Sequence, residues 1–289
     1  MDNESKSNLK PEEEKENTKI IEVKNVLKSS TKSNQAKIKL LVEGLSHENG
    51  LVRRNYAEEL GMIGKGAVPE LLNALLNSQS VIQRRAAAKA LKLVEDPTAL
   101  PHLIKALTND LDPVVQCSAA GAIAIFGETA AKHLIIVLEN QENTEMQYGL
   151  ASWCLAFIGA NAPSAIKKAA KSNNIKVKSA AISALEEHIR QTQDQEAIQL
   201  VESAINDADE NVQIEAIKLV GKLYKIDSLI PILISKLKNK SPDIRKATIL
   251  SLMQLNIKEA LNQLKKLLEL EQDKNVIKIV ELAIKRIDK

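Results

Sequence analysis

Apolar residues recur along this chain with a helical spacing that is nested inside a longer repeat. From about residue 36 onward, each anchor residue is followed by apolar or small residues about 5, 8 and 11 positions later, which is the spacing of one face of an α-helix. Successive anchors lie roughly 30 to 35 residues apart, a period typical of helical solenoids. The anchors are Val52, Ile82, Val115, Gln147, Val177, Val212, Ile244 and Val276.

A shorter amphipathic segment precedes each anchored helix, as in residues 68–76 and 229–237. Prolines stand in the first turn of several of these segments, where the missing N–H is tolerated. Polar turn residues separate the segments, and no stretch alternates in the manner of a β-strand. The sequence therefore predicts an all-α fold, an α-α superhelix (HEAT-like solenoid) of about eight helix pairs.

The first 34 residues have a different composition. They are rich in Glu, Lys, Asn and Ser and contain the acidic cluster of residues 12–14. Such a segment buries too little apolar surface to offset the entropy lost on ordering. We therefore expect two parts: a flexible, charged N-terminal tail over residues 1–34 and the solenoid over residues 35–289.

Composition favours a binding surface and narrows the classes of partner. The chain has 289 residues, of which 44% are hydrophobic but only 2% aromatic, as expected where Ala, Leu and Ile fill the space between stacked repeats. A net charge of +3 is too balanced for a nucleic-acid-binding face. The two cysteines do not suggest a disulfide framework. We expect a cytoplasmic protein with a protein partner, no nucleic-acid partner and no membrane insertion.

Catalytic and metal-binding motifs are sparse. The four histidines, His47, His102, His133 and His188, do not form pairs with the spacing of metal ligands. Gly-rich phosphate loops and local Ser/His/Asp motifs are not apparent either. We therefore expect no metal site and no resident cofactor, and the sequence assigns no catalytic residue.

The outward side of the central repeats is apolar. Counted from each anchor, offsets +2, +3, +6, +7 and +10 are expected to face away from the core, and the end repeats carry charges there. The central repeats instead carry Cys117, Gly121, Gly149, Trp153, Cys154 and Phe157. Two interpretations stay open: an exposed strip that binds a partner or ligand, or a core face of more enclosed helices. The position of Trp153 decides between them.

The helix pairs resemble HEAT repeats, especially in residues 84–91 and 151–159. More narrowly, residues 36–289 resemble the short HEAT-like repeats of cyanobacterial phycobilin lyases and phycobilisome-degradation proteins. Members of that group attach or detach open-chain tetrapyrroles at phycobiliprotein cysteines, act as chaperones for those subunits, or serve as scaffolds. The resemblance implies a phycobiliprotein subunit or assembly factor as the partner. It transfers no catalytic residue.

Two classes of function follow. The first is a scaffold or chaperone that binds a protein partner. The second is a phycobilin lyase or isomerase, or its subunit, with a transiently bound bilin. In the second case Trp153 and Phe157 hold the rings, and the guanidinium groups of Arg84 and Arg85 pair with the propionates. The scaffold is favoured because ionisable groups are sparse in the central strip.

A third, more distant alternative is an enzyme that resembles deoxyhypusine hydroxylase. That family is built of helical repeats and uses His-Glu dipeptides to hold two irons. Here only His47–Glu48 has that order, and it precedes the anchored helix instead of lying within it. This departure from the pattern argues against the hydroxylase.

Overall fold

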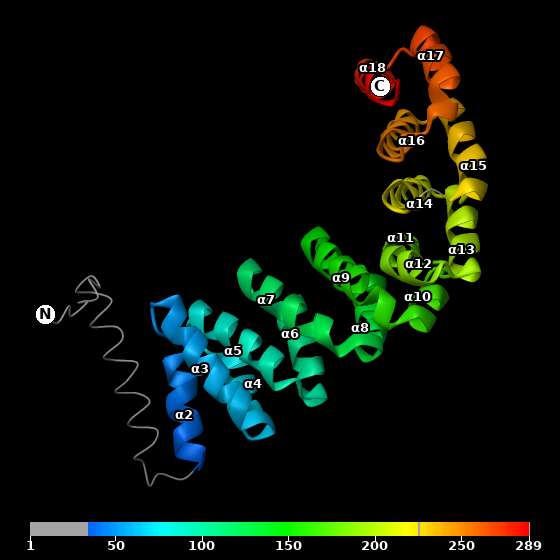
Figure 1. The fold of residues 1–289 in the computed structure, drawn as a ribbon. Coiled ribbons are helices and arrows are strands. Elements are labelled where there is room, and N and C mark those ends of the chain that lie inside the picture. The colour runs from blue at the N-terminus through cyan, green and yellow to red at the C-terminus, as the bar shows by residue number, and fades with distance from the viewer. Residues whose placement is uncertain (1–33, 225, 289) are drawn as a thin grey trace, which may run out of the picture. The chain divides into compact units, whose positions relative to one another are not determined.

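The structure, a computed structural model, describes residues 34–224 and 226–288, and every regular element within them is a helix (Figure 1). The predicted tail lies outside the described residues except for Asn34, where α2 begins. Within the described residues there are eight successive helix pairs, so the predicted all-α repeat architecture is confirmed.

Each pair consists of a first helix and a second helix that carries the anchor. The first helices are α2 (Asn34–Gly44), α4 (Val68–Asn77), α6 (Leu100–Asn109), α8 (Gly127–Glu139), α10 (Pro163–Ala169), α13 (Gln195–Ile205), α15 (Ile230–Ser235) and α17 (Leu261–Leu270). The second helices are α3 (Gly50–Ile63), α5 (Val81–Val94), α7 (Pro113–Ile123), α9 (Glu145–Ile158), α11 (Ile175–Ala184), α14 (Glu210–Lys222), α16 (Pro242–Gln254) and α18 (Lys274–Ile287). An additional short helix, α12 (Glu186–Thr192), follows α11.

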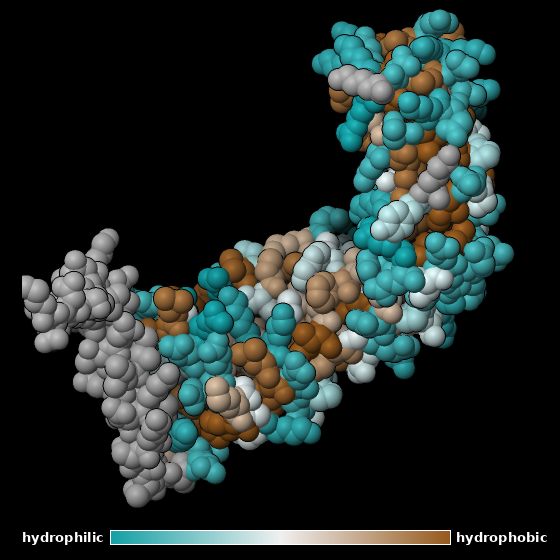
Figure 2. All heavy atoms as spheres, viewed as in Figure 1, coloured by the Kyte–Doolittle hydropathy of each residue, from teal (hydrophilic) through white to brown (hydrophobic). Residues whose placement is uncertain are grey.

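The described helices form two compact units. The first unit comprises residues 34–102 and 110–122, and the second comprises residues 103–109 and 123–288. In the second unit, α13, α15 and α17 form one layer and α14, α16 and α18 form another (Figure 1). Hydrophobic side chains fill the space between these two layers, whereas hydrophilic side chains cover the rims (Figure 2). The apolar stripe predicted from the repeat therefore lies between the layers.

A capping side chain three residues before the anchor sets the register of each second helix. Its oxygen accepts a hydrogen bond from a backbone N–H of the first turn, which satisfies a donor that has no partner within the helix. The caps are Asn49, Ser80, Asp112, Thr144, Asn174, Asp209, Ser241 and Asp273. Seven of the eight predicted anchors lie three residues after a cap, and all seven are buried.

The predicted anchor Ile82 is wrong by one residue. Ser80 caps α5, so Gln83 occupies the position of the anchor, and its side-chain amide donates to the Val42 carbonyl at 2.8 Å. Ile82 is therefore 36% exposed, and Leu93, predicted to be apolar core at +11, is 49% exposed. The apolar pattern could not reveal the shift, because the run of alanines in α5 supplies small residues in either register.

Second helices also bury a face that the repeat pattern assigned to the outside. In the second unit α9, α11, α14, α16 and α18 pack side by side in a row. The side chains at offset +7, such as Cys154 and Ser251, are consequently buried between neighbouring helices, and Ala180 and Ala247 at offset +3 are buried as well. Side chains at offsets +2, +6 and +10 remain on the surface. The outward face of each second helix therefore holds fewer positions than the five that the repeat pattern predicted.

One stretch departs from the expectation that no segment could cross a membrane. By length and composition alone, Pro113–Glu139 is long and apolar enough to cross a membrane, although 44% of its most apolar window is buried within the protein. The stretch consists of α7, a 3-10 turn and α8, and Gly127 interrupts it with a φ of 51°. Core helices of soluble proteins commonly have the same composition, so this stretch is weak evidence for a membrane span.

Candidate functional site

Three residues of α9 form an exposed stripe, which we call the aromatic stripe: Gly149, Trp153 and Phe157. They occupy offsets +2, +6 and +10, so they lie along one side of the helix. Trp153 is 50% exposed and Phe157 63% exposed, and their rings stack with centroids 5.8 Å apart. The structure thus decides between the two interpretations of Trp153, because the side chain lies on the surface and not in the core.

The glycines on this outer face are not required by packing within the chain. A Cβ atom built on Gly149, or on Gly121 of α7, would have nothing within 4 Å. Glycine inside a helix costs about 1 kcal/mol relative to alanine. The space above Gly149, next to an exposed tryptophan, suits the close approach of a ligand or partner.

Cys154 does not belong to this surface. It occupies offset +7, where it is fully buried, and burial raises the pKa of its thiol to about 12. The prediction that Cys154 faces outward is therefore wrong, since the adjacent second helix covers that side of α9. Cys117, at offset +2 of α7, is exposed as predicted.

The two cysteines are expected to differ strongly in reactivity. At pH 8 a thiol reagent such as DTNB should label Cys117 rapidly and leave Cys154 unmodified, because only an accessible thiolate reacts. Unfolding in guanidinium should release a second thiol per chain. A Cys117→Ser variant serves as the control and should show no rapid phase. Rapid labelling of two thiols in the folded protein would contradict the burial of Cys154.

Arg84 has partners within the first unit. Its Nε and Nη2 donate to the two carboxylate oxygens of Asp110 at 2.7 and 3.0 Å, and both side chains are largely buried. Its Nη1 donates to the carbonyls of Ser78 and Gln79. Such a two-pronged ion pair links α5 to the turn before α7, so the geometry favours a structural role for Arg84 over the predicted role of binding a propionate.

The contacts of Arg84 are one instance of a hydrogen bond that recurs in several repeats and that the apolar pattern does not predict. At offset +1 from the anchor, a long polar side chain donates to the carbonyl six residues earlier and so ties the interhelical turn to the second helix. The donor–acceptor pairs are Arg53–His47, Arg84–Ser78, Gln116–Asp110, Gln213–Asp207 and Arg245–Asn239. The recurrence of Arg or Gln directly after the true anchor is the sequence signal for this contact.

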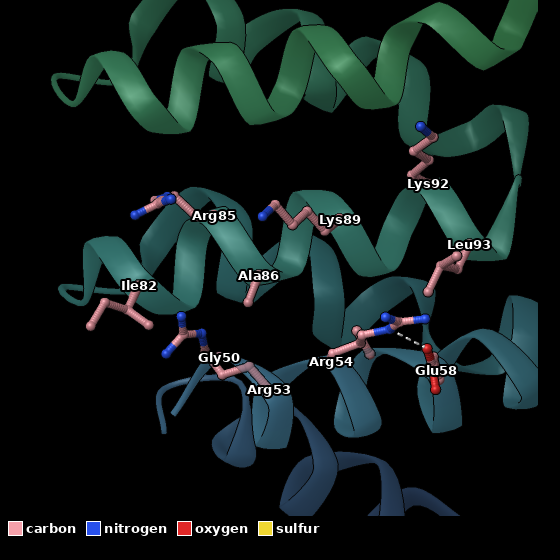
Figure 3. A pocket seen from close by; sticks show the side chains of 11 residues that line it. Gly50, Arg53, Arg54, Glu58, Ile82, Arg85, Ala86, Lys89, Lys92 and Leu93 are labelled. Carbon is pink, nitrogen blue, oxygen red and sulfur yellow. Dashed lines mark hydrogen bonds and ion pairs between the residues drawn. The ribbon is translucent and has the colours of Figure 1, made fainter. Parts of the chain in front are cut away.

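Arg85 lines a groove between α3 and α5 in the first unit (Figure 3). The groove has a volume of about 490 Å³ and carries five basic side chains but one acidic side chain, Glu58. Glu58 is paired with Arg54 at 2.7 Å. The groove is therefore a cationic hollow with an apolar lining, and only Arg85 of its basic residues was among the predicted site residues.

Histidine and acidic side chains form ion pairs but no metal site. Among the described residues, no three His, Cys, Asp or Glu side chains are grouped so that they could hold a metal ion. His188, predicted to be an apolar +11 residue, is buried with its Nε2 2.9 Å from Asp194. The hydrogen bonds from His188 and then Lys167 hold the pKa of Asp194 well below its usual range. Since Asp194 also caps α13, this cluster has a structural role.

The eight predicted site residues fall into two groups. Arg84, Arg85, Cys117 and Gly121 belong to the first unit. The second unit contains Gly149, Trp153, Cys154 and Phe157. Three of this second group form the aromatic stripe, and Arg85 lies in the cationic groove. The predicted site residues therefore do not form one surface: part of the strip is the aromatic stripe, and Arg85 lines a different groove.

Comparison with known proteins identifies both the repeat and a close relative. The family of HEAT repeats matches residues 38–124, 68–152, 162–230 and 199–285. The bilin biosynthesis protein MpeU of Synechococcus sp. strain WH8020 is 34% identical over 246 residues, which cover 85% of this chain and 83% of MpeU. An uncharacterized phycocyanin operon protein Z of Pseudanabaena tenuis is 32% identical over 122 residues, or 40% of this chain and 60% of that protein.

Among solved structures, yeast importin-β superimposes with a TM-score of 0.51 and 14% identity, over 88% of this chain and 42% of importin-β. At that identity the likeness concerns the fold alone. The HEAT-repeat match covers most of the sequence, and MpeU is similar over most of both chains. The chain therefore belongs to the HEAT-repeat proteins, in the group that contains the bilin biosynthesis protein MpeU.

Proposed function

We propose that this chain is a HEAT-repeat scaffold or chaperone that binds a phycobiliprotein subunit while an open-chain tetrapyrrole is attached to or removed from it. The observation that supports this proposal is the aromatic stripe on α9, where Trp153 and Phe157 stack in solvent. The similarity to a protein named for bilin biosynthesis supports the choice of partner.

The stripe has the properties of a binding hot spot. Large aromatic side chains contribute most of the affinity at many protein interfaces, because they bury much apolar area at a small entropic cost. Their exposure here leaves that area unused in the isolated chain. Gly149 provides open space on the same side of α9, so a partner backbone or a flat ring system could approach the helix closely.

A lyase or isomerase is the second candidate, and the extent of the similarity to MpeU favours it. Acid–base chemistry would require ionisable groups close to the chromophore. On α9 and the neighbouring α11, Lys176 and Glu145 pair at 3.2 Å, and Lys176 also lies over the Tyr148 ring. These groups already interact with one another, so a catalytic role would require a partner chain to supply further groups.

Replacing both aromatic residues is the direct test. Trp153→Ala/Phe157→Ala should weaken binding to apo-phycobiliprotein subunits by about 30-fold or more, because the loss of even one hot-spot residue costs about 2 kcal/mol or more. Binding would be measured by pull-down and by surface plasmon resonance with purified α and β subunits. Helicity by circular dichroism should be unchanged, since both side chains are at least half exposed.

The matched control is Leu250→Ala. Leu250 lies at the same +6 offset on α16 and is also exposed, so its removal tests whether any outer apolar residue matters. Unchanged affinity in the double variant, or an equal loss in the control, would contradict the proposal. Adding a free bilin to the same mixture separates the two candidates: a covalent adduct that survives denaturing electrophoresis and forms only when this chain is present indicates lyase activity, whereas a scaffold binds the subunit without increasing adduct formation.

A further inference from the structure

We infer that a groove between the first helices α15 and α17 binds an amphipathic helix of a partner protein, with acidic residues beside the apolar row of that helix. The groove belongs to first helices of the second unit, whereas the aromatic stripe belongs to a second helix. The inference therefore adds an interaction surface to the proposed function. It does not depend on the identity of the partner that the stripe binds.

Two helix faces form the walls of this groove, which has a volume of about 700 Å³. On one wall, Pro231, Ile234 and Lys238 recur at a spacing of three or four residues along α15 and the 3-10 turn that follows it. On the other wall, Leu267 and Leu270 are three residues apart on α17. Such spacings place side chains on one side of a helix, so each wall presents a continuous row to the groove.

The apolar residues of the groove are more exposed than core residues of the same helices. Leu270 is 79% exposed, and Ile234 and Leu267 are partly exposed. The core side of α17 is formed by Leu264, which is fully buried. α17 therefore has a second apolar side that packing within the chain does not use. Adjacent exposed apolar residues of this kind are typical of interaction sites.

Two lysines give the groove a net positive charge. Lys238 lies on one wall and Lys266 on the other, and neither pairs with a carboxylate within the described residues. The other two charged residues of the lining, Arg245 and Glu271, are largely buried and neutralise each other. The groove thus combines apolar walls with one free positive charge on each wall. Charge complementarity favours an occupant that is apolar in the middle and acidic on both flanks.

The corresponding groove between α2 and α4 in the first unit has a different character. Its volume is about 270 Å³, and most residues of its lining are polar. Its charged residues carry both signs, and Lys39 lies 4.0 Å from Glu70. A groove between neighbouring first helices is therefore not apolar and cationic in every repeat. The combination at α15 and α17 is a property of the residues that line it.

An α-helix suits this shape and this chemistry. A groove between two helices accepts the apolar side of a third, whose residues at i, i+3, i+4 and i+7 enter it. Acidic residues beside that apolar row then meet Lys238 on one wall and Lys266 on the other. A simple anion would leave the apolar walls uncovered, and a neutral helix would leave both lysines without a counterion.

The test measures binding of two fluorescent peptides to the full-length chain by fluorescence anisotropy. Both peptides have about 16 residues, enough to form a helix, with leucines at i, i+3, i+4 and i+7. One peptide carries glutamate at the flanking positions, and the other carries lysine there. The glutamate peptide should bind about tenfold more tightly or better, because it alone complements the two lysines of the groove. Raising the salt concentration should reduce this difference.

Lys238→Glu/Lys266→Glu reverses the charge on both walls and should reverse the preference, so that the lysine peptide binds more tightly. Both side chains are exposed, so helicity by circular dichroism should be unchanged. Lys240→Glu/Lys265→Glu is the matched control. It makes the same change in net charge at two exposed lysines outside the groove, and it should keep the original preference. Leu270→Ser should weaken binding of both peptides.

Four results would overturn the inference: no binding of the glutamate peptide, equal affinity of the two peptides, an unchanged preference in the groove variant, or an equal shift in the control. A dimer of this chain that Leu270→Ser dissociates in analytical ultracentrifugation would also overturn it, because the groove would then serve self-association. Trp153→Ala/Phe157→Ala should leave peptide binding unchanged, so failure at the aromatic stripe and failure at the groove are distinguishable.

Discussion

Gly159→Ala is expected to destabilise the second unit by about 3 kcal/mol or more, near or above the upper end of what overpacking costs in protein cores. Gly159 begins the 3-10 turn η4 (Gly159–Asn161) and has an ordinary φ of −51°, so glycine is required for space and not for conformation. A Cβ atom there would lie 2.0 Å from the carbonyl oxygen of Ala184 and 3.0 Å from its carbon. Backbone atoms cannot rotate away, so the turn and α11 would have to separate.

The measurement is thermal and urea unfolding followed by circular dichroism. For a unit of this size, a loss of about 3 kcal/mol corresponds to a decrease in Tm of roughly 10 °C. Gly149→Ala is the control in the same repeat, because its Cβ would project into open space. That change should stabilise α9 by about 1 kcal/mol. Equal stability of the two variants would show that the close approach at Gly159 does not exist.

Arg245→Met is expected to cost about 3 kcal/mol at neutral pH. Arg245 donates to both carboxylate oxygens of Glu271 at 2.6 and 2.7 Å, and the two side chains are only 13% and 4% exposed. It also donates to the carbonyls of Asn239 and Lys240. Removing one member of a buried pair leaves the other charge without compensation, which costs more than the pair itself contributes.

The loss should depend on pH in a defined direction. The hydrogen bonds from Arg245 are the main cause of a lowered pKa of Glu271. A lowered pKa contributes stability that is full above the pKa of an unfolded glutamate and fades as the pH falls through the folded value. Without Arg245, burial favours the neutral acid instead. The difference in unfolding free energy between the two proteins should therefore be largest at neutral pH and become smaller toward pH 4.

Urea unfolding at several pH values measures this difference. Arg54→Met is the control, because the Arg54–Glu58 pair is exposed and such pairs contribute less than about 1 kcal/mol. A similar loss in both variants, or a loss that does not change with pH, would contradict the assignment of a buried pair to Arg245 and Glu271.

The architecture could be predicted from the sequence because HEAT-type repeats pack on their nearest neighbours. The recurrence of Val115, Val212 or Val276 at the same place in a helical pattern is local information, and each copy confirms the others. Caps at polar residues such as Asp209 and Ser241 also follow from local preference. Hydrophobicity alone points to Ile82 as an anchor, whereas the cap Ser80 identifies Gln83 instead.

The candidate sites depended on information that no single repeat contains. Whether Cys154 is buried depends on the second helix that packs beside α9, and whether Arg84 is available depends on Asp110, 26 residues further along the chain. The groove lined by Arg85 and Leu93 exists only where α3 and α5 lie side by side.

For this protein, therefore, the sequence alone determined the helix pairs, their number and the apolar face between the layers, because these follow from periodic local preferences. Only the tertiary structure decided which outer positions stay accessible, because in the second unit neighbouring second helices cover offset +7 and leave +2, +6 and +10 at least partly exposed. That distinction placed Trp153 and Phe157 on the surface and Cys154 in the interior. The tertiary structure also showed that the two adjacent arginines differ: Arg84 pairs with Asp110, whereas the Nε of Arg85 has no partner within the described residues.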